Sequence, residues 1–188
     1  MKKNKQNRLF TLTATGIMAA LALAFSFAER ILLSAFPLPM GIKPGLSNII
    51  VMFTCSTLGL LPALGIAVAK AVFSALMSGI SAGFISLAGG LFSVLSMYVT
   101  LKFSKEKVSY TGISVLSSVM HNFGQLTAAS VIAGSFLFTG YAPVLIISGI
   151  VFGAATGTVL NITMPYLKKL TIKDYKKLSI KNKKDTEE

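Results

Sequence analysis

The sequence predicts an all-α, polytopic membrane protein with six transmembrane helices. Hydrophobic residues make up 53% of its 188 positions, and the mean hydropathy of +0.73 is unusually high for a soluble domain. Residues 9–28, 44–69 and 71–101 carry no charged side chain. An uncharged apolar run of about 18 or more residues is typical of a membrane-spanning helix. The polar–apolar alternation expected of a transmembrane β-barrel is absent.

The first apolar run, 9–28, follows the basic segment MKKNKQNR. This run is longer than the apolar core of about 7–15 residues in a cleavable signal peptide, and no convincing A-x-A site precedes Glu29. We therefore expect residues 1–8 to be a basic cytoplasmic N-terminus and the run to form an uncleaved first helix at 9–31.

Three basic segments fix how many spans follow. They lie at 1–8, 102–107 and 168–188 and hold most of the positive charge behind the formal net value of +12. Lysine and arginine beside apolar spans are retained on the cytoplasmic side and attract anionic lipids. An even number of spans must then separate each pair of segments. The chain between the first and second segments has room for four helices, and the chain between the second and third has room for two.

Turn-forming residues divide the apolar runs in agreement with this count. Gly59 and Pro62 interrupt the second run, a Ser/Gly series at 78–83 follows, and 138–143 separates the last two spans. The predicted helices are 9–31, 46–60, 62–78, 83–102, 109–135 and 143–167, within a transmembrane domain at 9–167. The second and third are short for a hydrocarbon core of about 30 Å, so we expect one to be re-entrant or shielded by neighbours.

A five-helix alternative treats 44–69 and 71–101 as single spans. It would place the lysine-rich tail, 168–188, outside the cell, against the positive-inside rule. We therefore expect a multi-pass protein of the cell membrane with both termini in the cytoplasm. The tail would contact membrane lipids, where it can lie as an amphipathic helix. Because the charge flanks the spans, we expect no nucleic acid partner.

Small residues recur at a spacing of four in the first and last spans, where they share a helix face and let backbones approach closely. The last span has Gly149, Gly153 and Gly157, and packing within the chain is the simpler interpretation of that stripe. In the first span the stripe is Gly16, Ala20 and Ala24. It either packs within the chain or docks a partner membrane protein.

The segment FPLPMGIKPGLSNII, residues 36–50, breaks the apolar pattern with three prolines and two glycines. Its first ten residues belong to a loop, 32–45, that the topology places outside the membrane. Prolines restrict the backbone and lower the entropy lost on ordering it. The loop is therefore either a preorganised cap over an outward-facing cavity, contributing Lys43 and followed by Asn48, or a tight structural turn.

Several polar side chains fall inside the predicted spans, where they are costly and usually face protein or water. Lys70 lies midway along the third span. The fifth span has a stripe with steps of four, three and four, which puts its members on one face. These are Ser114, Ser118, His121 and Gln125, with Asn122 beside them. They line a ligand cavity or form a hydrogen-bond network between helices.

The outer half of the protein has a net positive charge, from Glu29, Arg30, Lys43 and Lys70 together. A pocket there favours an anionic or phosphate-bearing ligand. Glu29 and Arg30 can pair with each other or with the two lysines. The candidate ligand-binding residues are Lys43, Asn48, Lys70, His121, Asn122 and Gln125.

The residues for several kinds of catalysis are missing. There is no P-loop motif, and the only aspartates, Asp174 and Asp185, lie in the basic tail. An enzyme acting on a prenyl diphosphate needs carboxylates that hold magnesium, and a Ser/His/Asp triad is excluded in the membrane region. His121 is the only histidine. We expect no catalytic activity of the chain by itself, no cofactor and no metal site.

Three segments resemble the Gx transporter family, whose members are often labelled heptaprenyl diphosphate synthase component I. They are MGIKPGLSNII (40–50), SLAGGLFS (86–93) and MHNFGQL (120–126), and the likeness covers about residues 10–165. It implies a bundle similar to the S component of energy-coupling-factor transporters, with an outward vitamin site capped by the first loop. It also implies that Gly16, Ala20 and Ala24 dock a coupling subunit. Arginine is common in the family where this chain has Lys70, which keeps the charge but loses bidentate anion binding.

These observations are compatible with two kinds of function. In the first, the chain is a substrate-binding or transport subunit for a small vitamin-, flavin- or isoprenoid-like molecule, energised by a membrane coupling subunit and ATPases. In the second, it is a non-catalytic accessory of heptaprenyl diphosphate or menaquinone synthesis that assists a soluble prenyl synthase. A variant of the second makes it a scaffold in a flavin- or quinone-linked electron-transfer system.

Overall fold

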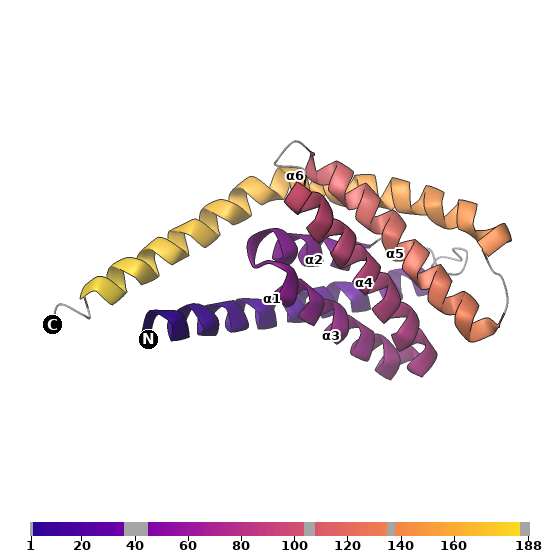
Figure 1. Ribbon diagram of the computed structural model, residues 1–188, viewed down its shortest axis with the longest axis horizontal. Coiled ribbons are helices and arrows are strands. Elements are labelled where there is room, and N and C mark those ends of the chain that lie inside the picture. The colour runs from indigo at the N-terminus through magenta and orange to yellow at the C-terminus, as the bar shows by residue number, and fades with distance from the viewer. Residues whose placement is uncertain (1, 36–44, 104–107, 135–137, 185–188) are drawn as a thin grey trace.

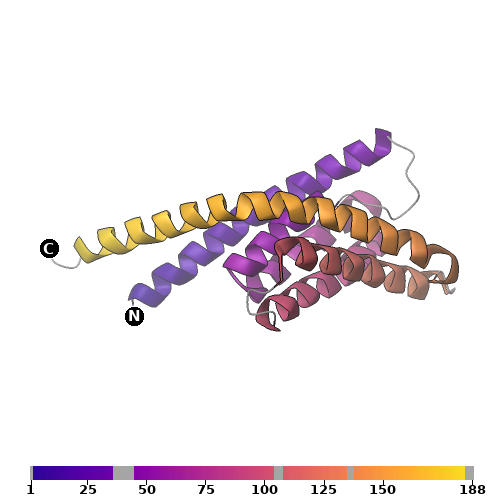
Figure 2. The same cartoon turned by 90° about the horizontal axis from the view of Figure 1, so that it is seen from above.

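The computed structural model describes residues 2–35, 45–103, 108–134 and 138–184, which form six helices and no strand. The helices are α1 (Lys2–Ala35), α2 (Leu46–Thr57), α3 (Leu60–Ser78), α4 (Ile80–Phe103), α5 (Tyr110–Ala133) and α6 (Phe138–Lys184). Both ends of the chain lie at one end of the bundle, which we call the termini end (Figures 1 and 2). The opposite end, where α1 stops and α6 starts, is called the distal end.

The helices pack in an order that leaves α2 in the middle. Consecutive helices α3, α4, α5 and α6 pack side by side, and α1 packs against α2 and α3. The short α2 contacts α1, α3, α4 and α6. This central position confirms the expectation that one short helix is shielded by its neighbours.

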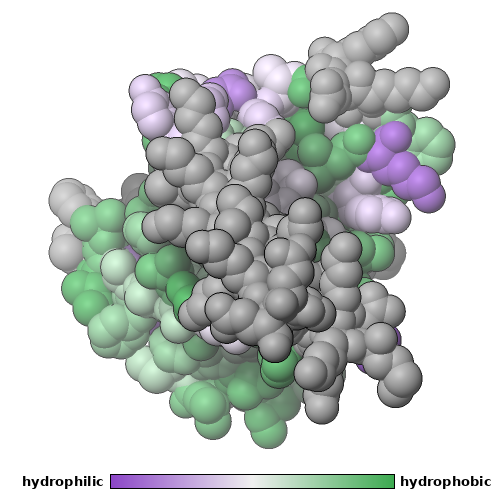
Figure 3. Space-filling view, turned by 90° about the vertical axis from the view of Figure 1, so that its left-hand side faces the viewer, coloured by the Kyte–Doolittle hydropathy of each residue, from purple (hydrophilic) through white to green (hydrophobic). Residues whose placement is uncertain are grey.

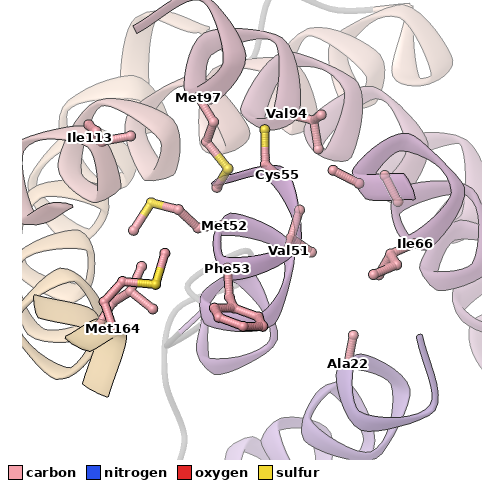
Figure 4. Close-up of a cluster of buried hydrophobic side chains, with 13 residues drawn as sticks. Ala22, Val51, Met52, Phe53, Cys55, Ile66, Val94, Met97, Ile113 and Met164 are labelled. Atoms are coloured by element: carbon pink, nitrogen blue, oxygen red, sulfur yellow. The ribbon is translucent and has the colours of Figure 1, made fainter. Parts of the chain in front are cut away.

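The hydrophobic core surrounds α2 and receives residues from all six helices. Five consecutive α2 residues, 51–55, are buried, so every face of the helix is covered there. Figure 4 shows Met52, Phe53 and Cys55 of α2 with Met97 of α4 and Met164 of α6 around them. Met adapts to irregular gaps, which suits a core where helices of different lengths meet.

The outer surface of the bundle is apolar. Large hydrophobic side chains are exposed on every long helix, and seen from the termini end they cover much of the visible flank (Figure 3). Four stretches are long and apolar enough to cross a membrane: Arg8–Leu33, Leu60–Ser78, Ile80–Phe103 and Gly140–Tyr166. The protein is therefore an all-helical, membrane-type protein.

The structure confirms six helices. Two of them are not long and apolar enough to count as membrane-spanning helices by themselves. Helix α2 has only 12 residues. Helix α5 has 24 residues but is not among the four apolar stretches, because its Ser, His, Asn and Gln side chains lower its hydropathy. Both pack against several neighbouring helices. Six crossings, and the side on which the termini lie, stay predictions.

Two of the predicted breaks are glycines with backbone angles that other residues rarely adopt. Gly59 separates α2 from α3 with φ 95° and ψ −172°, and Gly79 separates α3 from α4 with φ 91° and ψ 165°. This region is essentially restricted to glycine. Pro62 lies inside the first turn of α3, where proline is tolerated because N–H groups there have no intrahelical acceptor.

The terminal helices are longer than predicted. Helix α1 already begins at Lys2, and α6 starts at Phe138, ahead of Pro143, and continues to Lys184. The basic residues 2–8 and 168–184 therefore belong to the first and last helices without a break. Lys, Arg, Gln and Leu in these segments are good helix formers.

The glycine stripe of α6 packs against α5, as the simpler interpretation predicted. A methyl group added to Gly153 would lie 2.7 Å from the Cα of Val115, and one added to Gly157 would lie 2.6 Å from the Cα of Thr111. Helices α5 and α6 are also joined by a hydrogen bond of 2.9 Å between the hydroxyls of Ser114 and Thr156. Close backbone contact of this kind requires small residues.

Candidate ligand-binding cavity

A cavity of about 670 Å³ lies at the distal end, and all six helices contribute to its walls. Its lining comes from the end of α1, the first turn of α2, the second half of α3, the start of α4, the middle and second half of α5 and the start of α6. Cavities of about 300–1,000 Å³ are typical for small-molecule ligands. The bundle is thus packed solidly around residues 51–55 and hollow at its distal end.

Lys70 is half-buried in this cavity, on the face of α3 that turns away from lipid. Its Nζ donates a hydrogen bond of 3.0 Å to Oδ1 of Asn48, in the first turn of α2. Ser74 and Ser78 follow Lys70 at steps of four and line the same cavity. Lysine at such depth is costly unless it faces polar groups, and this face of α3 supplies them.

Glu29 is only 5% exposed and lies against the N-terminus of α2. Its carboxylate accepts hydrogen bonds from the backbone N–H groups of Leu46 and Ser47 and from the hydroxyl of Ser47. The first N–H groups of a helix have no intrahelical acceptor, and the helix dipole favours an anion beside them. Glu29 therefore fastens α1 to α2 at the cavity wall.

Arg30, next to Glu29, reaches α3. Its Nη1 donates a hydrogen bond to Oγ of Ser78, and both residues line the cavity. Phe27 of α1 also contacts Phe73 of α3 edge to face, with 6.5 Å between ring centroids. Arg30 and Lys70 thus bring two cationic groups to the cavity, and Glu29 is the one carboxylate among the described residues that line it.

The wall opposite α3 is formed by α5 and α6. His121, Asn122 and Gln125 line the cavity from α5. Asn122 Nδ2 donates hydrogen bonds to the backbone oxygen of Leu145, at 2.7 Å, and to Oγ of Ser148, at 3.4 Å. This amide therefore already joins α5 to α6, as the network interpretation of the stripe expects.

A glycine of α4 allows His121 and Gln125 to lie where they do. A methyl group added to Gly89 would lie 2.6 Å from Cγ of Gln125 and 3.0 Å from Cε1 of His121. Gly124 of α5 is equally close to α4, because a methyl group there would lie 2.8 Å from the backbone oxygen of Ala88. The SLAGGLFS and MHNFGQL segments are therefore packed against each other.

Five of the six predicted ligand-binding residues line this one cavity, from three different helices. They are Asn48, Lys70, His121, Asn122 and Gln125. Lys43 and most of the proline-rich loop at 32–45 lie outside the described residues, so a cap over the cavity stays a prediction. Whether the five bind a ligand is likewise a prediction.

One member of the predicted stripe does not reach the cavity. Ser114 is 5% exposed and forms its hydrogen bond with Thr156 between α5 and α6, whereas Ser118 lines the cavity. Ser114 therefore fits the network interpretation of the stripe, because α5 runs from the core to the distal end and Ser114 lies at core depth. Residues on one face of α5 can thus lie either in a helix–helix contact or in the cavity wall.

The other predicted feature, the small-residue stripe of α1, lies on the outside of the bundle. Gly16, Ala20 and Ala24 are all exposed, and a methyl group added to Gly16 would meet nothing within 4 Å. The stripe therefore does not pack within the described chain. That a partner subunit docks there is still a prediction.

Sequence reasoning missed several lining residues. Ser74 and Ser78 could have been found, because they follow Lys70 at helical steps of four. Phe73, Tyr141 and Phe152 also line the cavity, but aromatic residues in an apolar span give no signal that separates a cavity wall from a lipid-facing surface.

The cavity combines apolar and aromatic walls with two cationic groups, the Glu29 carboxylate and several neutral hydrogen-bonding side chains. Such a lining suits an amphipathic molecule with an acidic group. Among the residues that the structure describes, no group of three or more His, Cys, Asp or Glu side chains is placed to hold a metal ion.

The comparisons with known proteins agree with the motifs. The model of one protein family, described as heptaprenyl diphosphate synthase component I, matches residues 18–163. This range contains every described residue of the cavity wall. No curated protein and no solved structure matches the chain. Since the family match covers most of its length, the chain belongs to the heptaprenyl diphosphate synthase component I family.

Proposed function

We propose that this chain is a non-catalytic membrane subunit that binds a small amphipathic anion in the distal cavity and serves its transport. The observation that carries the proposal is the placement of Lys70 and Arg30 in one cavity of about 670 Å³ inside an otherwise apolar bundle. Ionisable side chains within membrane segments are expensive and normally serve a function. An acidic group bound beside Lys70 and Arg30 would offset the free-energy cost of placing these charges in the membrane.

The proposed ligand has one acidic end and a larger apolar body. Lys70 is held by a neutral amide, Asn48, which an anion can replace or share. Phe73, Tyr141 and Phe152 contribute aromatic surface to the lining, which favours a ring or an unsaturated chain. Vitamin-, flavin- and isoprenoid-like acids fit this description.

The distribution of charge supports an orientation in the membrane. The basic residues 2–8 and 168–184 are at the termini end (Figures 1 and 2), and the positive-inside rule retains such segments in the cytoplasm. The distal cavity then faces the outside of the cell membrane, where a subunit for uptake would receive its substrate.

Movement of the ligand across the membrane needs energy that this chain does not supply. We propose that a coupling membrane subunit with its ATPases docks on Gly16, Ala20 and Ala24. Their exposure on α1 supports this, because small residues at a spacing of four allow another helix to approach closely.

The family description supports a second candidate function. The words "component I" imply association with another synthase component. In this role the chain is a membrane accessory that holds a prenyl-type product or anchors a soluble synthase, without catalysing the reaction. An isoprenoid diphosphate is itself an amphipathic anion, so the cavity suits both functions.

A thermal-shift screen of the purified protein in mild detergent tests ligand binding. We expect at least one compound among flavins, vitamins and isoprenoid phosphates to raise the melting temperature of the wild type, and Lys70→Ala to lose most of that shift. Lys102→Ala is the matched control, since it removes the same charge from the exposed end of α4. Equal shifts in both variants would contradict the assigned site.

Co-purification separates the two functions. Capture of a coupling subunit with ATPases that is lost in Ala20→Leu supports transport, because the larger side chain blocks close helix contact. Capture of a soluble prenyl synthase, with a shortened quinone side chain in a deletion strain, supports the accessory role and would refute the transport proposal.

A further inference from the structure

A second, much smaller cavity of about 10 Å³ lies between α2, α3, α4 and α5, against the wall of the large one. It shares Asn48, Lys70, Ser86 and His121 with the lining of the large cavity. Ser93 lines only the small cavity. The two cavities therefore meet at Lys70 and His121, on the side of the large cavity that faces the core.

Ser93 is the unusual member of this lining. Its side chain is 1% exposed, and its Oγ has no hydrogen-bond partner among the described residues. A buried serine in a helix commonly bonds to a backbone oxygen of the preceding turn, as Thr100 does with Ser96 at 2.7 Å. A buried hydroxyl without a partner is costly, so a partner is expected inside the cavity that Ser93 lines.

We propose that the small cavity binds one ordered water molecule, which exchanges a hydrogen bond with Ser93 Oγ and accepts one from Lys70 Nζ. A volume of about 10 Å³ holds about one water-sized sphere, and a stable buried water needs two to four polar partners. Asn48, Lys70, Ser86, Ser93 and His121 provide them.

Other occupants fit less well. A metal cation would lie beside the Lys70 ammonium group, which repels it. An apolar atom of a ligand would leave Ser93 Oγ without a partner.

The water gives Ser93 a positioning role. Lys70 is held from one side by Asn48 and from the other by the water, so its ammonium group has a defined place in the wall of the large cavity. This inference does not depend on the identity of the large cavity's ligand, nor on whether the chain serves transport or synthesis.

Ser117 provides a matched control. Its side chain is also 1% exposed and also lacks a partner among the described residues, but it lines neither cavity. Replacing a dry buried hydroxyl by alanine removes a desolvated group, whereas replacing one bonded to water breaks a hydrogen bond.

The test compares melting temperatures of Ser93→Ala and Ser117→Ala in the same detergent. We expect Ser93→Ala to lower the melting temperature by about 2–4 °C and Ser117→Ala to leave it unchanged or raise it. An equal rise in both variants overturns the proposal.

A map of the wild-type protein at about 2 Å resolution is a second and independent readout. Density for one water within hydrogen-bond distance of Ser93 Oγ and Lys70 Nζ supports the proposal. A small cavity without such density overturns it, whichever way the melting temperatures move.

Discussion

At the residue scale, the polar side chains of the distal end are satisfied mainly by contacts between helices. Glu29 of α1 meets the N-terminus of α2, Arg30 meets Ser78 of α3, and Lys70 of α3 meets Asn48 of α2. Each contact joins α1, α2 or α3 to another of the three. The same side chains that line the cavity therefore hold its wall together.

The contact between Glu29 and α2 leads to a graded prediction. Glu29→Ala removes an acceptor for three donors, but the two bonds from Ser47 are long and weak at 3.4 Å. The loss should therefore be close to that of one hydrogen bond to a charged group, about 1.5–3 kcal/mol. We expect Glu29→Ala to lower the free energy of unfolding by about 2–3 kcal/mol. Glu29→Gln keeps one acceptor oxygen and should lose about half as much. Thermal unfolding in detergent measures both, and an equal loss in the two variants would contradict a role for the charge.

At the element scale, glycine decides how closely helices approach. Helices α5 and α6 are in backbone contact at Gly153 and Gly157, and α4 and α5 are in contact at Gly89 and Gly124. These contacts run on the faces away from lipid. They place α5, which contributes His121, Asn122 and Gln125 to the cavity, between two neighbours.

Gly153 and Gly65 form a matched pair for testing this packing. A methyl group on Gly153 would lie 2.7 Å from the Cα of Val115, whereas one on Gly65 of α3 would meet nothing within 4 Å. Gly153→Ala should therefore destabilise the protein by about 1–3 kcal/mol. Gly65→Ala should be neutral or stabilise by up to about 1 kcal/mol, because alanine is the better helix former. Melting temperatures of the two variants test this, and similar losses would show that overpacking is not the cause.

The α3–α4 turn gives a further prediction at this scale. Gly79→Ala forces a side chain into φ 91° and ψ 165°, which costs about 1–3 kcal/mol. No neighbouring atom lies within 4 Å of the added methyl group, so the loss would be backbone strain alone. Gly65→Ala serves again as control, since it adds the same methyl group inside a helix. A melting temperature of Gly79→Ala at the wild-type value would contradict the strain.

At the scale of the whole molecule, the bundle has two halves with different contents. The half nearer the termini is filled by the core around residues 51–55, and the distal half holds the cavity of about 670 Å³. The packed core keeps the helices in place, and the cavity leaves room for a ligand. The basic segments continue from the filled half.

Thiol labelling tests the orientation of these halves in the membrane. Cys55 is the only cysteine and is buried, so the background is low and Cys55→Ser removes it. Gly140, at the start of α6, and Val108, before α5, are both exposed. In intact cells a membrane-impermeant reagent should label Gly140→Cys, whereas Val108→Cys should need permeabilisation, because lysine-rich flanks stay inside. The reverse pattern would invert the proposed topology.

Much of the fold could be predicted from the amino-acid composition and from the uncharged apolar runs along the sequence. Long uncharged runs predicted helices, and Gly59 and Gly79 marked two of the breaks correctly. The bounds of α1 and α6 were predicted too short, because the prediction ended helices where the membrane ends. The hydrogen bonds of a helix do not depend on lipid, so both helices extend through their basic segments.

The sequence by itself determined that the protein is an apolar helical bundle with a few expensive polar side chains, because hydropathy and helical period are properties of local sequence. Only the tertiary structure decided which of those side chains share a cavity. Ser114 and Ser118 lie on one face of α5, yet one bonds to α6 and the other lines the hollow. The outcome depends on the depth at which neighbouring helices stop packing, and that depth is set by contacts between residues far apart in the chain.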